Sequence, residues 1–333
     1  MDNKHQDLLV VENLTMEFVG TKRFLQKKKP NVRAVNNVSF TVREGETFGL
    51  VGESGCGKTT LGKCIVRLLK PSQGKLLYND EGEWKDLLDL KKKESFELRK
   101  KVQIVFQDPY ASLNPQHTIL EAFDEPMRVH GIGGKDKEAR KKLIAEALER
   151  VNLQPDYMYR YPHEFSGGQR QRLCVAKALV LQPKLIVCDE PVSALDVSVQ
   201  AQLLNLMRKL QKELGVTYIF IAHDLSVVQY MSDRIGVMYL GNMVELADAD
   251  ALYEKPLHPY TEALLSAVPV PVVNGKRDRI VLEGDVPSPM NPPTGCPFHP
   301  RCSKCMEICK KEKPQLVEMD HDHFVSCHLY EKC

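Results

Sequence analysis

Short apolar runs alternate with amphipathic stretches through the middle of the chain. The apolar runs predict strands, and the stretches with apolar residues three or four positions apart predict helices. Strands are expected at 47–51, 102–106, 184–189, 216–222 and 234–239, and helices at 60–69, 198–214 and 225–231. Because strands and helices alternate, the pattern favours an α/β fold with a mainly parallel sheet.

The regions around this alternation have other patterns. Residues 8–50 are β-rich, whereas residues 116–160 are expected to be largely helical. Prolines accumulate after residue 255 and predict a looser, extended tail. We therefore expect one large domain at 1–255, with a helical subdomain at about 108–180, and a C-terminal extension at 256–333.

A glycine-rich segment lies between the strand at 47–51 and the next helix. Gly52–Thr59 reads Gly-Glu-Ser-Gly-Cys-Gly-Lys-Thr and fits the phosphate-loop pattern. The glycines let backbone N–H groups approach an anion, and the helix N-terminus adds a partial positive charge. Lys58 can reach β- and γ-phosphates, and the Thr59 hydroxyl can bind Mg²⁺. A turn that matches by chance is the alternative, which the strand–helix context disfavours.

Two acids follow the apolar strand at 184–188. A carboxylate at the end of a buried strand is costly unless a cation compensates it, so Asp189 is a candidate Mg²⁺ residue. Glu190 comes where the strand gives way to a loop, and it is a candidate general base for an attacking water. Two surface acids are the alternative.

A further segment, Phe165-Ser166-Gly167-Gly168-Gln169-Arg170, precedes this strand. In content and order, the motifs from about Leu8 to Leu246 resemble those of the ATP-binding-cassette (ABC) ATPases. The resemblance implies a P-loop NTPase with a RecA-like core, an N-terminal β subdomain and a helical subdomain that carries the signature Ser166–Gln169. It also implies that two cassettes dimerise head to tail, with each signature closing on the ATP of the partner. ATP binding would close the dimer and hydrolysis would open it.

The resemblance gives roles to single residues. Gln107 resembles the Q-loop glutamine, Asp196 lies in a D-loop-like segment at the dimer interface, and His223 resembles the switch histidine that holds the γ-phosphate. Phe18 resembles the aromatic residue that stacks on adenine, with an ordinary core or loop phenylalanine as the alternative. The implied Mg²⁺ residues are Thr59, Gln107 and Asp189. The implied ATP-binding residues are Phe18, Gly52, Glu53, Ser54, Gly55, Cys56, Gly57, Lys58, Thr59 and Thr60.

Three segments narrow the resemblance to the oligopeptide and dipeptide importers: 107–115, 188–198 and 258–265. The Tyr110-Ala111 pair and the Gly-Cys-Gly of the phosphate loop resemble the second ATPase subunit of that group, the OppF/DppF type. The implied partners are a second ATPase subunit, two transmembrane permease subunits and an extracellular or periplasmic substrate-binding protein. A nickel or glutathione importer is an alternative, as is a soluble ABC ATPase with a metal- or redox-sensing tail.

Composition adds limits to this picture. The formal charge of the 333 residues is +2, which gives no strong field for nucleic acid. No apolar run approaches the ~18 residues of a membrane span, and residues 1–7 lack the apolar core of a signal peptide. We expect a peripheral protein at the cytoplasmic face of the membrane, held there by its partners.

Six of the ten cysteines lie after residue 295. Disulfides are rare in the cytoplasm, so a metal site is the better interpretation. Cys296, Cys302, Cys309 and Cys327 resemble the four positions that hold a 4Fe–4S cluster in the importer group. Structural zinc and free thiols are the alternatives. Further candidate ligands are Cys305, which could replace a neighbour, and His321, His323 and His328, for which a surface position is the commoner case; Cys333 is expected to be a free thiol.

Overall fold

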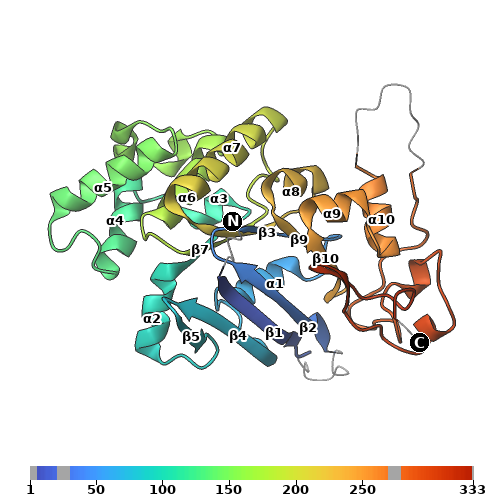
Figure 1. The fold of residues 1–333 in the computed structure, drawn as a ribbon. Coiled ribbons are helices and arrows are strands. Elements are labelled where there is room, and N and C mark those ends of the chain that lie inside the picture. The colour runs from blue at the N-terminus through green and yellow to red at the C-terminus, as the bar shows by residue number, and fades with distance from the viewer. Residues whose placement is uncertain (1–5, 21–30, 269–278, 332–333) are drawn as a thin grey trace, which may run out of the picture. The chain divides into compact units, whose positions relative to one another are not determined.

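The computed structural model describes residues 6–20, 31–268 and 279–331 (Figure 1). The chain forms two compact units, which we name by the motifs they contain. The loop unit comprises residues 7–42, 47–88 and 222 onward, and includes the phosphate loop. The signature unit comprises residues 43–46 and 89–221, and includes the segment Ser166–Gln169.

The loop unit contains a sheet with the strand order β2-β1-β4-β5. Its strands are β1 (Asp7–Phe18), β2 (Val32–Arg43), β4 (Gln73–Asp80) and β5 (Glu83–Asp86). Strand β4 runs antiparallel to both β1 and β5. The β-rich start that the sequence predicts is therefore present.

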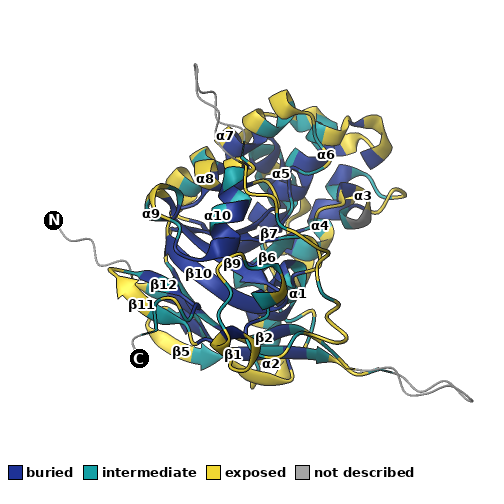
Figure 2. Cartoon of the chain, turned by 90° about the vertical axis from the view of Figure 1, so that its right-hand side faces the viewer, coloured by how far each residue is buried: buried dark blue, intermediate teal, exposed yellow. Residues whose placement is uncertain are grey.

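Further strands of the loop unit follow the order β11-β12-β10-β9-β3. They are β3 (Thr47–Val51), β9 (Arg234–Tyr239), β10 (Asn242–Asp248), β11 (Val317–Asp320) and β12 (His323–Val325). β3 and β9 are parallel, whereas β10 pairs antiparallel with both β9 and β12. β9 is buried throughout and β10 almost throughout, as their dark blue colour in Figure 2 shows.

The helices of the loop unit are α1 (Lys58–Ile65), α8 (Leu225–Met231), α9 (Ala249–Glu254) and α10 (Pro259–Ser266), with short 3₁₀ helices η3 (His299–Arg301) and η4 (Ile308–Lys310). The prediction of a helix at 60–69 was wrong at both ends. The chain turns at Arg67, whose φ is +59°, and the Leu68 amide donates to the Lys63 carbonyl at 2.8 Å. Leu68 is 57% exposed, so it does not extend the apolar face of α1.

The signature unit contains the parallel strands β6 (Val102–Val105), β7 (Leu185–Asp189) and β8 (Thr217–Ile221). Its α-helices are α2 (Lys92–Lys101), α3 (Pro109–Ser112), α4 (Ile119–Val129), α5 (Lys137–Arg150), α6 (Gly167–Leu179) and α7 (Val197–Leu214), and its 3₁₀ helices are η1 (Pro155–Tyr159) and η2 (Pro162–Glu164). Helices α4 and α5 pack on each other (Figure 1). A capping box of Thr118 and Glu121 starts α4.

The tail is more ordered than its prolines predict. Pro259 occupies the first turn of α10, where a missing N–H costs nothing, so this proline starts a helix instead of breaking one. Further along, β12 adds to the edge of β10 through the pairs Glu245–Val325 and Leu246–Phe324. The described part of the tail therefore contributes to a sheet of the loop unit.

Candidate functional site

The phosphate loop follows β3 and ends at Gly57, which caps α1. A Cβ atom at Gly52, where φ is +146°, would lie 2.1 Å from the Met238 carbonyl oxygen. At Gly57, where φ is +107°, it would lie 2.0 Å from the Ala34 carbonyl oxygen. Backbone conformation and close packing therefore both require glycine at these two positions.

Lys58 is 5% exposed, and its side chain bends back onto the loop. Its Nζ atom donates to the Gly52 carbonyl at 2.6 Å and to the Glu53 carbonyl at 3.1 Å. The neighbouring Cys56 thiol is buried, which raises its pKa, although Lys58 opposes the shift. Cys56 is therefore a neutral thiol, and the loop presents the positive charge of Lys58 at the α1 N-terminus.

Glu53 is held by residues that the sequence reasoning missed. The Glu53 N–H donates to the Tyr260 hydroxyl at 2.8 Å, and the carboxylate forms a bidentate ion pair with Arg301. Neither partner carries a local motif that points to the loop. Residues 258–265 resemble a segment of the importer group, and this resemblance does not predict the contact with Glu53.

Asp189 and Glu190 lie at the end of β7 in the signature unit. Asp189 is 5% exposed. Glu190 has a φ of +49°, which is uncommon for a residue with a side chain, and its N–H donates to the Ile221 carbonyl at 2.9 Å. Gln107 Nε2 donates to the Glu190 carboxylate at 3.1 Å and lies 3.3 Å from the Ser193 hydroxyl. The structure thus brings together Gln107 and Glu190, two of the predicted catalytic residues.

The signature segment starts α6 with a capping box. The Ser166 hydroxyl accepts from the Gln169 N–H at 3.3 Å, and the Gln169 side chain accepts from the Ser166 N–H at 3.0 Å. Ser166 and Gly167 are exposed. A Cβ atom at Gly168 would lie 2.4 Å from a Val199 methyl group, so α6 and α7 approach closely there. The N-terminus of α6 therefore offers backbone N–H groups on an accessible surface.

Asp196 caps α7, and its carboxylate accepts from the Ser198 hydroxyl at 2.7 Å and the Val199 N–H at 3.0 Å. These hydrogen bonds, that of Ser198 first, hold the pKa of Asp196 below its usual range. His223 and Phe18, both exposed, belong to the loop unit, where His223 precedes α8 and Phe18 ends β1. Phe18 is 42% exposed, so it is not an ordinary core residue.

The four predicted cluster cysteines gather in the tail. Cys296, Cys309 and Cys327 are buried, Cys302 is half-buried, and the Cys296 N–H donates to the Cys309 carbonyl at 2.8 Å. Cys296 interacts electrostatically with the other three thiols. Burial raises the pKa of Cys296 to about 12 and that of Cys327 to about 11. Among the described residues, no three His, Cys, Asp or Glu side chains converge closely enough to hold a single metal ion.

The histidines near Cys327 have other partners. His323 is 7% exposed and its Nε2 atom lies 2.8 Å from the Glu245 carboxylate, so the expectation of a surface position was wrong. His328 contacts the Glu331 carboxylate and the Glu312 carbonyl. His321 is exposed, and Cys333 lies outside the described residues. His323 Nε2 and both ring nitrogens of His328 are thus engaged by oxygen atoms.

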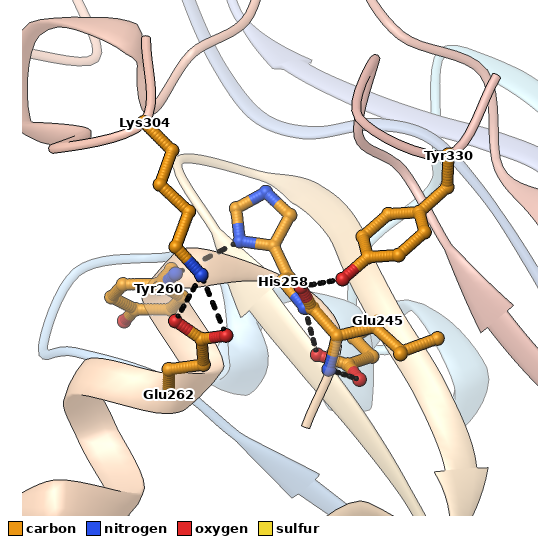
Figure 3. A network of polar contacts seen from close by, with 7 residues as sticks. Glu245, His258, Tyr260, Glu262, Lys304 and Tyr330 are labelled. Atoms are coloured by element: carbon orange, nitrogen blue, oxygen red, sulfur yellow. Dashed lines mark hydrogen bonds and ion pairs between the residues drawn. The ribbon is translucent and has the colours of Figure 1, made fainter. Parts of the chain in front are cut away.

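A buried polar network joins β10, α10 and the tail (Figure 3). Glu245, which is fully buried, accepts from the Leu257 N–H at 2.7 Å and the His258 N–H at 2.9 Å, as well as contacting His323. Burial lowers the pKa of His258 to about 3, so this ring is neutral and its Nδ1 accepts from the Tyr260 N–H at 3.1 Å. Glu245 therefore fixes the start of α10, which carries Tyr260 to the phosphate loop.

No helix in the described part of the chain has the length and apolar character needed to cross a membrane. Two family models match the sequence: "ABC transporter" over residues 35–193 and "Oligopeptide/dipeptide transporter, C-terminal region" over residues 244–309. The second match includes Cys296, Cys302 and Cys309.

Similar proteins cover nearly the whole chain. A putative oligopeptide transport ATP-binding protein of Bacillus subtilis, YkfD, is 54% identical over 97% of this chain and 95% of its own length. The oligopeptide transport ATP-binding protein AppF of the same organism is 50% identical over 98% of both chains. A probable peptide ABC transporter ATP-binding protein of Sinorhizobium fredii is 49% identical over 97% of this chain and 90% of its own.

Solved structures of ATP-binding cassettes have the same fold. The cassette MJ0796, in a dimeric post-hydrolysis state with ADP and phosphate, matches with a TM-score of 0.62 and 29% identity over 73% of this chain and 99% of that one. The cassette cbiO1 of Clostridium perfringens matches with a TM-score of 0.63 and 26% identity over 75% of this chain and 92% of that one. The fold is therefore that of an ABC ATPase cassette, a mixed α/β structure, as the sequence predicted.

Proposed function

The chain belongs to the ATP-binding subunits of the oligopeptide/dipeptide branch of the ABC transporter family, and on this premise we propose that it hydrolyses ATP to power peptide import. The observation that carries the proposal is the similarity to oligopeptide transport ATP-binding proteins over nearly the full length of both chains. The phosphate loop, with glycines where a side chain cannot fit, supports ATP as the substrate.

We propose the following roles for the predicted residues in ATP hydrolysis. Lys58 and the backbone N–H groups of the loop would bind the phosphates, and His223 would hold the γ-phosphate. Thr59, Gln107 and Asp189 would hold Mg²⁺, which when bound neutralises phosphate charge. Glu190 would accept a proton from the attacking water, and Gln107, 3.1 Å from its carboxylate, would orient it.

We further propose that the chain works as half of a dimer. The exposed Ser166 and Gly167 at the α6 N-terminus would donate N–H groups to the γ-phosphate bound by a partner ATPase subunit. Two permease subunits and a substrate-binding protein would complete the importer, with this subunit at the cytoplasmic face of the membrane. The segment after Gln107 is the proposed permease contact, supported by Tyr110, which is 65% exposed with Arg170 stacked on its ring.

Transport assays test the cargo. We expect disruption of the gene to abolish uptake of labelled di- to hexapeptides, and complementation with the wild-type chain, but not with Lys58→Ala, to restore it. Uptake of nickel and of glutathione should be unchanged in the same cells. Loss of nickel or glutathione uptake with normal peptide uptake would replace the peptide assignment with one of these alternatives.

We also propose that the tail cysteines hold a 4Fe–4S cluster, with Cys296, Cys302, Cys309 and Cys327 as ligands. Support comes from the gathering of these four cysteines in the tail, where Cys296 interacts electrostatically with the other three thiols. The sequence spacing of these cysteines is wider than the paired Cys-x-x-Cys that is usual for zinc. Because burial raises the pKa of the Cys296 and Cys327 thiols, loading the cluster would release protons from them.

Metal analysis of anaerobically purified protein tests this ligand set. We expect iron and sulfide in equal amounts, with visible absorption that air bleaches, and loss of both in Cys309→Ser. Cys305→Ser is the matched control and should retain the iron. Zinc without iron, or no metal in the wild-type chain, would contradict the cluster, and loss of iron in Cys305→Ser would change the ligand set.

A further inference from the structure

The cysteine-rich tail contacts the phosphate loop directly. Arg301, between Cys296 and Cys302, places Nη1 2.7 Å from Oε2 and Nη2 3.1 Å from Oε1 of Glu53. The side chain of Arg301 is 7% exposed and that of Glu53 27% exposed. A bidentate pair in this setting is shielded from solvent, unlike an ordinary surface ion pair.

Glu53 is held at three of its groups. Tyr260 binds its N–H, Lys58 binds its carbonyl, and Arg301 binds its carboxylate. Since Gly52 and Glu53 also supply the carbonyl groups that hold Lys58, the position of Glu53 bears directly on the phosphate-binding ammonium. A substitution of Arg301 should therefore alter the position of the Lys58 ammonium.

Arg301 is itself anchored in the core of the loop unit. Phe298, three residues earlier and 1% exposed, packs edge-on against the Tyr239 ring at a centroid distance of 5.3 Å. It also packs at a tilt against the Tyr260 ring at 5.4 Å. Tyr239 and Tyr260 are fully buried, and the Tyr239 hydroxyl lies 3.5 Å from Arg301 Nη1. The segment between Cys296 and Cys302 thus packs against β9 and α10 and contacts the phosphate loop.

The negative charge of Glu53 explains how its ion pair with Arg301 affects ATP binding. A free carboxylate in a phosphate-binding loop would repel the polyphosphate of ATP. Arg301 neutralises this carboxylate, and its fixed bidentate geometry also orients the loop backbone. Glu53 in turn raises the pKa of Arg301, so the guanidinium keeps its charge at every physiological pH.

We propose that Arg301 is a positioning residue for the phosphate loop, through which the cysteine-rich tail sets the ATP affinity of the cassette. This inference rests on the proposed ATP site, since it assigns no new ligand. It predicts that removing the guanidinium weakens ATP binding more than it slows the chemical step. Substrate already bound would still meet Lys58 and Glu190.

The test compares two ion pairs of the same tail. Lys304 pairs with Glu262 on α10 at 2.8 Å (Figure 3), whereas Arg301 pairs with Glu53 of the phosphate loop, so Lys304→Met is a matched control for Arg301→Met. We expect Arg301→Met to raise the Kd for mant-ATP, and the KM for ATP, about tenfold, which corresponds to about 1.4 kcal/mol. The kcat should change less than twofold, and Lys304→Met should leave the Kd unchanged.

A double variant separates charge from folding. In Glu53→Gln/Arg301→Met the unpaired carboxylate is gone, so we expect the Kd to return most of the way to the wild-type value. Iron content and thermal unfolding midpoints of all variants are measured alongside. Equal Kd values for Arg301→Met and the wild type, or equal losses in Arg301→Met and Lys304→Met, would overturn the proposal. A wild-type chain that does not bind mant-ATP would instead overturn the proposed ATP site itself.

Discussion

Replacing Glu190 with glutamine is expected to slow ATP hydrolysis by about 10²- to 10⁴-fold while ATP still binds. The amide keeps the shape and can still contact Gln107, but it cannot accept a proton from water. The backbone of Glu190 is held at a φ of +49° by the hydrogen bond from its N–H to Ile221, and this aims the side chain. Because binding is spared, the ATP-bound dimer should accumulate in its closed form.

Hydrolysis by the assembled transporter and the size of the ATP-bound complex are the measurements. Glu149→Gln, an exposed glutamate on α5, is the control for a loss of charge alone and should behave like the wild type. Unchanged hydrolysis in Glu190→Gln would show that another group is the general base. Loss of hydrolysis together with loss of ATP binding would point to a structural role for Glu190.

Replacing Glu245 with alanine is expected to lower the free energy of unfolding by about 3–5 kcal/mol. Glu245 is fully buried and accepts from two backbone N–H groups while contacting His323. Without it, these polar groups remain buried without an acceptor. Urea and thermal unfolding measure the loss, and the first structure to loosen should be the start of α10.

Glu262→Ala is the matched control, because Glu262 lies on α10 but pairs with the exposed Lys304. We expect this variant to lose less than about 1 kcal/mol. If the two variants lost equal stability, the energetic importance of the buried network would be refuted. If Glu245→Ala unfolded like the wild type, water or a rearranged side chain would have to satisfy the freed N–H groups.

Local signals explain what could be predicted from the sequence. The glycine spacing of the phosphate loop and the acids after β7 depend on neighbours in the chain, so Lys58 and Glu190 could be identified directly. The end of α1 was missed because the left-handed turn at Arg67 carries no glycine signal. Arg301 was missed because it meets Glu53 across 248 positions, a contact that no periodicity encodes.

The prolines of the tail predict less regular secondary structure than the tail contains. Prolines predict breaks in regular structure, yet Pro259 starts a helix. The sequence predicts a metal ligand or a surface residue at His323, yet its ring contacts a buried carboxylate. Both errors have one physical cause. Proline and histidine have several structural uses, and the packing partner selects among them.

The position of β12 has a consequence for any shortened form of this protein. β10 has β9 on one side and β12 on the other, so a chain cut at residue 255 would leave β10 without a neighbouring strand on the β12 side of Glu245 and Leu246. Such an open edge is a template on which a strand of another molecule can add. Strand β12 thus protects this edge of the sheet. Removal of the tail by a protease would favour self-association of the cassette.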